Sequence, residues 1–344
     1  MPTKSFGLGG ISTTPKKRFI AALKREKVDR PAVGCVTQSV TVDQMEAVGA
    51  FWPEAHSDAK KMAMLGAAGA KVFGFENARI PFCLTVEAEA FGCVVDLGKV
   101  DRTPMVKKHL YEAEDTPVIP EGFLEKGRVK TVIEATKMLK QQYGNELPIV
   151  VGTTGPLTIA GHLVGTENLL LMMITDPEAV HKFIKVAAEM EKQYLQALVA
   201  AGADVIAMSD PSASTDMLSG EMFDEFALPY TKKAWEGAKG ALKILHICGD
   251  TTTLLDHMIA TGCDAVSIEE KVNPAKAVEI VNGRVALVGN MGVVRPLLQG
   301  TADECREHAI EIKKAGFNVI APGCGLAARV PKANIEAMVK AVKE

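Results

Sequence analysis

The sequence has no long basic run, no long hydrophobic run and no apolar segment of the signal-peptide type near its start. Its 344 residues carry a net charge of −3, and the one run of more than two lysines or arginines is in PKKRF, so nucleic acid is not expected as the main partner. The longest apolar window, NLLLMMI, is far too short to span a bilayer. We therefore expect a cytoplasmic protein with no membrane partner.

The sequence also lacks the cysteine pattern of a disulfide framework. Its seven cysteines are an odd number, scattered over a long chain, which favours reduced thiols. Most buried cysteines act as small hydrophobic residues. Five are therefore expected to be structural: Cys35, Cys83, Cys93, Cys263 and Cys305.

One local pattern occurs four times along the chain, in AAGAKVFGFEN, AAGADVIAMSD, ATGCDAVSIEE and KAGFNVIAPGC. Each copy has a glycine after a helix-like segment, and glycine in the left-handed conformation commonly ends a helix. The short apolar run that follows is typical of a strand buried on both faces. Each run then ends in residues suited to chemistry: Glu76–Asn77, Ser209–Asp210, Glu269–Glu270 and Gly323–Cys324.

Four further apolar runs, at 31–38, 148–155, 242–249 and 284–292, bring the number of expected strands to eight. Strands that alternate with helices indicate a parallel sheet, and eight such units favour a closed (β/α)8 TIM barrel. An open sheet is less favoured, because the first strand is not followed by Gly-x-Gly-x-x-Gly. We expect one barrel domain over residues 1–344, with an N-terminal helical segment.

The segment at about 80–125 is too long for a simple connection between barrel units. We expect it to be a hairpin-like insertion after the second strand that lies over the barrel mouth, where barrel enzymes elaborate their sites.

The most informative stretch is KILHICG, in which His246 and Cys248 lie two residues apart at the end of the fifth strand. Residues i and i+2 of a strand point to the same side, and barrel chemistry takes place at the C-terminal ends of the strands. Cys324, after the eighth strand, is expected at the same rim, and Glu269 or Glu270 is a candidate fourth ligand. One nitrogen, two sulfurs and an exchangeable oxygen are typical of zinc.

These segments resemble the methylcobamide:coenzyme M methyltransferases of methanogenesis from methylated one-carbon compounds (methanol- or methylamine-specific type), which belong to the uroporphyrinogen decarboxylase superfamily. The motifs that carry the resemblance are HICG, SIEEK and APGCG, and the similarity runs along essentially the whole chain, including TQSVTVDQMEAVGAFWPEAH. The resemblance implies a (β/α)8 barrel. It also implies a Zn²⁺ ion held by His246, Cys248, Cys324 and Glu269, with Glu269 as the ligand that gives way to substrate.

The activity implied by this resemblance is transfer of a methyl group from a methylated corrinoid to the thiol of coenzyme M. Zinc removes the proton of a bound thiol at neutral pH, and the thiolate is the form that attacks. The sequence has no Asp-x-His-x-x-Gly cobalamin-binding motif. We therefore expect the methylcobamide to be carried by a separate corrinoid protein that docks at the barrel mouth.

Three alternatives remain at this point. One is a related zinc methyltransferase with another thiol acceptor, such as homocysteine, and another is a binding subunit with a structural zinc. A uroporphyrinogen decarboxylase-like enzyme is less favoured, because the stretch CVTQSVTVDQ after the first strand has no arginine to pair with a substrate that carries many carboxylates.

Four further residues are weaker candidates for substrate binding. Arg79 and Arg329 follow expected strand ends and are candidates for the sulfonate of coenzyme M. Asp210 and Asn290 end expected strands, and they either orient His246 or cap neighbouring helices. His162, in TIAGHLVG, is a candidate for the lining of the barrel mouth.

Overall fold

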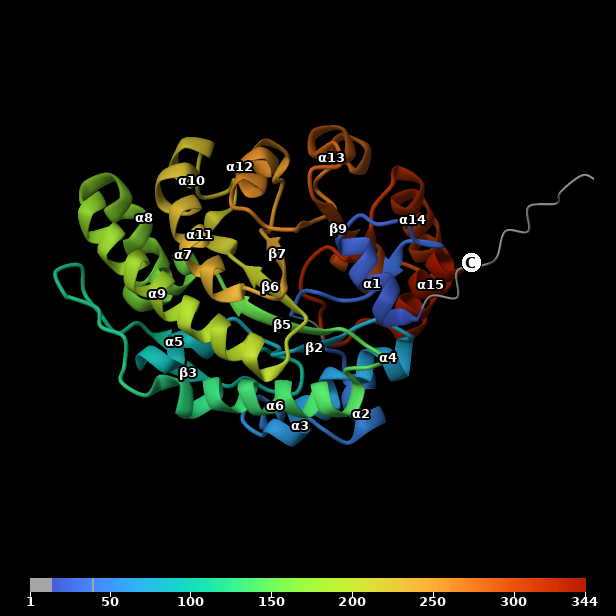
Figure 1. Ribbon diagram of the computed structural model, residues 1–344, viewed down its shortest axis with the longest axis horizontal. Coiled ribbons are helices and arrows are strands. Elements are labelled where there is room, and N and C mark those ends of the chain that lie inside the picture. The colour runs from blue at the N-terminus through green and yellow to red at the C-terminus, as the bar shows by residue number, and fades with distance from the viewer. Residues whose placement is uncertain (1–13, 39) are drawn as a thin grey trace, which may run out of the picture.

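The computed structural model describes residues 14–38 and 40–344. Its centre is a sheet of eight parallel strands that curls into a barrel, in the order β1-β10-β9-β8-β7-β6-β5-β2 (Figure 1). This arrangement confirms the predicted TIM-barrel class. The strands are β1 (Ala32–Val33), β2 (Ala78–Ile80), β5 (Ile149–Thr154), β6 (Val205–Ser209), β7 (Leu242–His246), β8 (Ala265–Ile268), β9 (Ala286–Met291) and β10 (Val319–Pro322).

The barrel closes differently at its two seams. The first strand pairs with the last, with Ala32 opposite Val319. Between β1 and β2 no strand pairing is present among the described residues, and the side chain of Asn77 bridges the gap. Its Oδ1 accepts a hydrogen bond from the Cys35 amide at 3.0 Å, and its Nδ2 donates to the Cys35 carbonyl at 2.8 Å. The Glu76 amide also donates to the Val33 carbonyl at 2.8 Å, so a side-chain amide and one backbone hydrogen bond take the place of a strand pair at this seam.

The inside of the barrel is packed with small and branched apolar residues. They form one buried cluster that includes Val150, Ala207, Ile244, Ala265 and Val288. Further along several of these strands, a polar residue lies two positions after the apolar one and so points to the same side. Because the strands are parallel, these polar residues gather at the C-terminal rim of the barrel.

Helices cover the outside of the barrel, and α3 and α6 lie side by side below β2 (Figure 1). Among the described residues no single helix is long and apolar enough to cross a membrane, although the bent pair α7 and α8 passes the same test by length and composition. The helices are α1 (Pro15–Leu23), α2 (Val42–Val48), α3 (Ala59–Gly66), α4 (Ala68–Phe73), α5 (Val86–Phe91), α6 (Gly127–Tyr143), α7 (Pro156–Val164), α8 (Thr166–Thr175), α9 (Pro177–Ala201), α10 (Gly220–Phe226), α11 (Leu228–Trp235), α12 (Leu255–Ala260), α13 (Pro274–Val281), α14 (Ala302–Ala315) and α15 (Lys332–Lys343).

Three of the four repeated glycines end a helix as expected. Gly202, Gly262 and Gly316 have φ values of 110°, 83° and 104°, in the left-handed region that favours glycine. The prediction for the first copy is wrong. Gly69 lies inside α4, and the helix ends at Gly74 with φ 79°.

The second strand therefore comes later than the sequence pattern suggested. The run after Gly69 is helical, and β2 begins at Ala78. Glu76 and Asn77 consequently precede the strand instead of ending it, and Arg79 lies within it. The polar residues of this copy serve the β1–β2 seam and not the barrel mouth.

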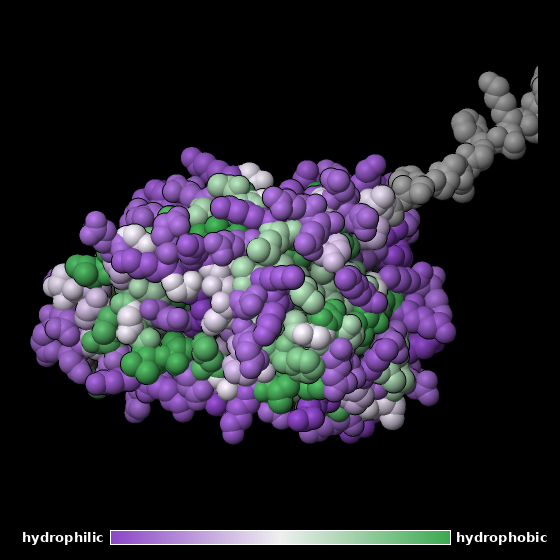
Figure 2. Space-filling model, turned by 90° about the horizontal axis from the view of Figure 1, so that it is seen from below, coloured by the Kyte–Doolittle hydropathy of each residue, from purple (hydrophilic) through white to green (hydrophobic). Residues whose placement is uncertain are grey.

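The long segment after β2 contains α5 and an antiparallel hairpin, β3 (Val94–Asp96) with β4 (Met105–Lys108). Its tip reaches the loop after β10, where Arg329 Nη2 lies 3.0 Å from Asp101 Oδ2. The molecular surface is mostly hydrophilic with patches of hydrophobic side chains (Figure 2). The segment itself exposes large hydrophobic residues, among them Val94, Met105 and Val118.

Candidate metal centre

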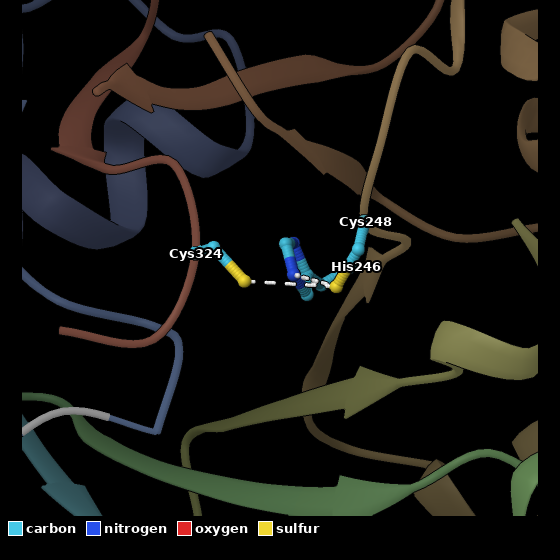
Figure 3. A group of neighbouring side chains, drawn as sticks. All are labelled: His246, Cys248 and Cys324. Carbon is cyan, nitrogen blue, oxygen red and sulfur yellow. Dashed lines mark hydrogen bonds between the residues drawn. The ribbon is translucent and has the colours of Figure 1, made fainter. Parts of the chain in front are cut away.

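Three predicted ligands meet at the C-terminal rim of the barrel. His246 ends β7, Cys248 follows two residues later, and Cys324 comes from the loop after β10 (Figure 3). Their side chains point toward one another, with ligand atoms all within 4.8 Å of each other. Residues 76 positions apart in the sequence are brought together because both strands end at the same rim.

The distances between these atoms suit a tetrahedral metal ion. Cys248 Sγ lies 3.5 Å from His246 Nε2 and 3.6 Å from Cys324 Sγ. In a tetrahedral zinc site with ordinary bond lengths, two sulfurs lie about 3.8 Å apart and a sulfur and a nitrogen about 3.5 Å apart. One imidazole and two thiols with this spacing are a donor set that fits zinc.

The ring of His246 is oriented by Ser267, on the neighbouring strand β8. His246 Nδ1 lies 3.2 Å from the Ser267 carbonyl oxygen and 3.1 Å from Ser267 Oγ. A proton on Nδ1 is donated to the carbonyl, which leaves Nε2 free as a ligand. Ser267 was not among the predicted site residues, because its role depends on the register that places it opposite His246 on the next strand.

Cys324 is held by its backbone. Thr37, in the loop after β1, donates a hydrogen bond from Oγ1 to the Cys324 carbonyl at 2.8 Å. Without a metal, the hydrogen bond with the Cys248 thiol and burial raise the pKa of Cys324 far above its ordinary value. The two thiols are thus close enough to oppose each other's ionisation, a conflict that a divalent cation between them relieves.

The structure does not bring Glu269 into this group, which among the described residues contains His246, Cys248 and Cys324. The carbonyl of Glu269 accepts a hydrogen bond from Asn290 Nδ2. The side chain of the adjacent Glu270 reaches the loop after β10, where a Cβ on Gly323 would lie 3.2 Å from Glu270 Oε2. That oxygen is buried and has no hydrogen-bond partner among the described residues, and burial raises the pKa of Glu270.

The three ligands face a cavity of about 540 Å³. One wall is formed by the segment after β2, including Phe82–Thr85 and Thr103–Val106, so the insertion borders the mouth as expected. Cys83 and His162 also line the cavity, and Cys83 thus has a position at the site that its structural assignment did not anticipate. The described residues that line this cavity include no lysine and no arginine.

Neither arginine proposed for substrate binding lines the cavity. Arg79 is buried inside the barrel, where its Nε donates to the Val36 carbonyl at 3.3 Å and its Nη1 donates to the Pro81 carbonyl. Burial lowers its pKa to about 10. Arg329 is exposed and pairs with Asp101 on the hairpin.

Asp210 and Asn290 have capping and bracing positions, and the hydrogen bonds of the His246 ring to described residues go to Ser267 and Cys248. Asp210 is buried and accepts hydrogen bonds from the amide and the hydroxyl of Thr158 in the first turn of α7. Burial raises its pKa to about 6. Asn290 donates from Nδ2 to the carbonyls of Glu269 and Val272 and so fixes the loop after β8.

Comparisons with known proteins show the family of this chain. The uroporphyrinogen decarboxylase (URO-D) family model matches residues 14–344. The chain is 39% identical to the methylcobamide:CoM methyltransferase MtbA of Methanosarcina acetivorans, over 96% of this chain and 98% of that protein. It is 37% identical to the methylcobamide:CoM methyltransferase MtaA of Methanosarcina barkeri, over 96% of this chain and 98% of that protein.

A solved structure of a methyltransferase from Methanosarcina mazei superposes with a TM-score of 0.93 at 38% identity, over 96% of this chain and 99% of that one. With a family model that spans nearly every residue and relatives that align end to end, the chain belongs to the uroporphyrinogen decarboxylase family, together with the methylcobamide:CoM methyltransferases.

Proposed function

We propose that this protein transfers a methyl group from a methylcobamide to the thiol of coenzyme M. The observation that supports this most strongly is the 39% identity, over nearly the full length, to a methylcobamide:CoM methyltransferase. The group of His246, Cys248 and Cys324 at the rim of a cavity adds a chemical reason, because activating a thiol requires its proton to be removed.

In this proposal the resident metal is Zn²⁺, held by His246 Nε2 and the sulfurs of Cys248 and Cys324. Zinc bound to three protein ligands supplies an open position at which a thiol loses its proton near neutral pH. The protein's own contribution is to fix the three ligand atoms. Ser267 sets the tautomer of His246, and Thr37 holds the backbone at Cys324.

A carboxylate is the expected fourth ligand when no substrate is bound. The resemblance assigns this role to Glu269, whereas the unpaired, buried Oε2 beside Gly323 favours Glu270. Replacing each in turn by glutamine separates the two. Removal of the carboxylate that competes with the substrate thiol for the metal should lower KM for the thiol, and removal of the other should not.

The methylcobamide is proposed to arrive on a separate corrinoid protein that docks at the barrel mouth. The cavity is bordered there by the β3–β4 hairpin and the loop after β10, both of which lie at the surface. Access for the large corrin ring is therefore from the side of the molecule that carries the metal ligands.

Decarboxylation of a porphyrinogen is disfavoured by the lining of this cavity. Among the described residues that line it there is no lysine or arginine to pair with substrate carboxylates. Part of the chain is 31% identical to the uroporphyrinogen decarboxylase of Chlorobium phaeovibrioides, which reflects the shared family. A methyltransferase that uses another thiol, such as homocysteine, has the same metal chemistry and is separated from the proposal by the assay below.

The test combines metal content with activity. Purified protein is assayed for zinc and for methylation of coenzyme M and of homocysteine by free methylcobalamin. We expect about one zinc per chain and preferential methylation of coenzyme M. Cys324→Ala should lose both zinc and methylation, whereas Cys305→Ala, which changes a buried cysteine on α14, should keep both. Full activity of zinc-free Cys324→Ala contradicts the metal assignment, and methylation of homocysteine alone contradicts the acceptor.

A further inference from the structure

A second cavity, of about 200 Å³, adjoins the metal-ligand cavity. The two cavities share Val106 and His162 as lining residues, so these side chains form the wall between them. The smaller cavity is also lined by Lys107, Lys108 and His109 at the end of β4, and by Gly165 and Thr166 at the start of α8.

The lining of this second cavity is positively charged. The positive charge comes from Lys107 and Lys108, and no aspartate or glutamate is among the described residues that line it. Lys107 has an ion pair with Asp96 at 3.4 Å, and His109 Nε2 lies 3.7 Å from Glu112 Oε1, whereas no described carboxylate lies within ion-pair distance of Lys108. An anionic ligand that enters here therefore meets at least one cation, Lys108, that is not already paired with a described carboxylate.

His162 links this charge to the metal-ligand cavity. Burial lowers the pKa of His162 to about 4, so the ring is neutral at pH 7. A neutral imidazole has one N–H donor, and His162 Nδ1 is buried with no hydrogen-bond partner among the described residues. The ring is thus a hydrogen-bond donor on the wall, with lysines on its far side.

We propose that His162, in the wall shared by the two cavities, and the lysines of the smaller cavity bind the sulfonate of the acceptor thiol. The inference rests on the proposed function, which supplies a thiol at the metal end and a sulfonate two carbons away. Because that chain is short, the sulfonate must bind at the wall of the metal-ligand cavity, which has no lysine or arginine of its own among its described lining residues. At the wall formed by His162, a sulfonate accepts a hydrogen bond from the N–H of the neutral ring and lies in the field of Lys107 and Lys108.

The experiment compares two acceptors of equal chain length, coenzyme M and 2-mercaptoethanol, whose hydroxyl replaces the sulfonate. The variants are His162→Gln and the double variant Lys107→Gln/Lys108→Gln, and the control is Lys99→Gln, an exposed lysine at the hairpin tip outside the cavity. We expect KM for coenzyme M to rise about tenfold in both variants, with KM for 2-mercaptoethanol unchanged. Titration of ethanesulfonate by calorimetry should show the same loss of affinity without any turnover.

Two results overturn the proposal: an unchanged KM for coenzyme M, or an equal rise of KM for both thiols. A failure of the proposed function itself is distinguishable, because the unaltered protein would then methylate neither thiol. Ethanesulfonate that binds the variants as tightly as it binds the unaltered protein also counts against the assignment.

Discussion

At the scale of single residues, the metal ligands were predictable because strand geometry is strict. Side chains two apart on a strand share a side, and parallel strands end at one rim, so His246, Cys248 and Cys324 followed from the apolar runs that precede them. Ser267 was not predictable in the same way. A serine inside an apolar strand has many uses, and its role depends on the register between β7 and β8, where it pairs with His246.

Replacement of Ser267 by alanine tests the orientation of the His246 ring. The variant loses the hydroxyl contact at 3.1 Å and keeps the carbonyl contact at 3.2 Å. Groups that orient a metal-ligating histidine are typically worth about 10- to 100-fold in metal affinity, and we expect a loss at the lower end of that range. Competition with a chromophoric zinc chelator measures it. Zinc affinity equal to that of the unaltered protein would mean that the carbonyl alone orients the ring.

His56 makes the stability of the protein depend on pH. It is buried against Trp52, with ring centroids 5.0 Å apart, and neither of its nitrogens has a hydrogen-bond partner among the described residues. Burial, and next the charge of Arg128, lower its pKa from 6.5 to about 3. A depressed pKa means that the unfolded chain binds the proton first, so stability is complete above pH 6.5 and is lost as the pH falls toward 3.

We expect His56→Phe to flatten this acid dependence. At pH 5 the unaltered histidine costs about 2 kcal/mol relative to pH 7.5, from the gap between pH 5 and its unfolded pKa, and phenylalanine has no proton to gain. Urea unfolding at pH 7.5 and pH 5 measures the free energy of unfolding of both proteins. An identical decrease in the two proteins between these pH values would show that His56 does not contribute to it.

At the scale of elements, sequence patterns correctly located the strands that have long apolar runs. They misplaced β2, which has no such run. β5, β6 and β7 coincide closely with the expected runs. β5 and β6 are buried along their whole length and β7 over its last three residues, which leaves little freedom of register. The run after Gly69 was read as a strand and is α4. An apolar run of two or three residues fits either a helix or a strand, and tertiary contacts decided between them.

The insertion is tied to the barrel by Arg128, at the start of α6. Its guanidinium donates to the Glu89 carboxylate, to Thr85 Oγ1 at 3.0 Å and carbonyl at 2.9 Å, and to Cys83 Sγ at 3.2 Å. These partners span the loop before α5 and the helix itself. One planar donor group thus fixes the part of the insertion that borders the cavity.

We expect Arg128→Lys to destabilise the protein by about 2 kcal/mol, because an ammonium cannot reproduce this fork of donors and leaves buried acceptors unpaired. The matched control is Arg329→Lys, whose side chain is 65% exposed in its pair with Asp101 and should change stability by less than about 0.5 kcal/mol. Urea unfolding measures both, and hydrogen exchange should show faster exchange in α5 of the first variant only. Equal costs for the two variants would contradict a special anchoring role.

At the scale of the whole molecule, closure of the barrel couples the two ends of the chain. Ala32 pairs with Val319, so the first and the last strands cannot separate independently. We propose on this basis that the chain folds as one domain, as expected from its eight repeated units. The β1–β2 seam could not be predicted from the sequence, because it depends on hydrogen bonds from the side chain of Asn77 to the backbone. The residues around Asn77 do not distinguish this role from that of an asparagine in a turn.

Asn77→Ala tests both the seam and the one-domain proposal. It removes the two hydrogen bonds that the Asn77 side chain makes with the backbone of Cys35 inside the protein, which should cost about 2–3 kcal/mol. Asn273→Ala, which removes an exposed cap on α13, is the matched control and should cost about 1 kcal/mol. If the barrel is one cooperative unit, the seam variant lowers the midpoint of a single unfolding transition, and its calorimetric and van't Hoff enthalpies stay equal. A second unfolding transition in Asn77→Ala would contradict the one-domain proposal. It would mean that the residues around β1 and β2 unfold separately from the other strands once the seam is weakened.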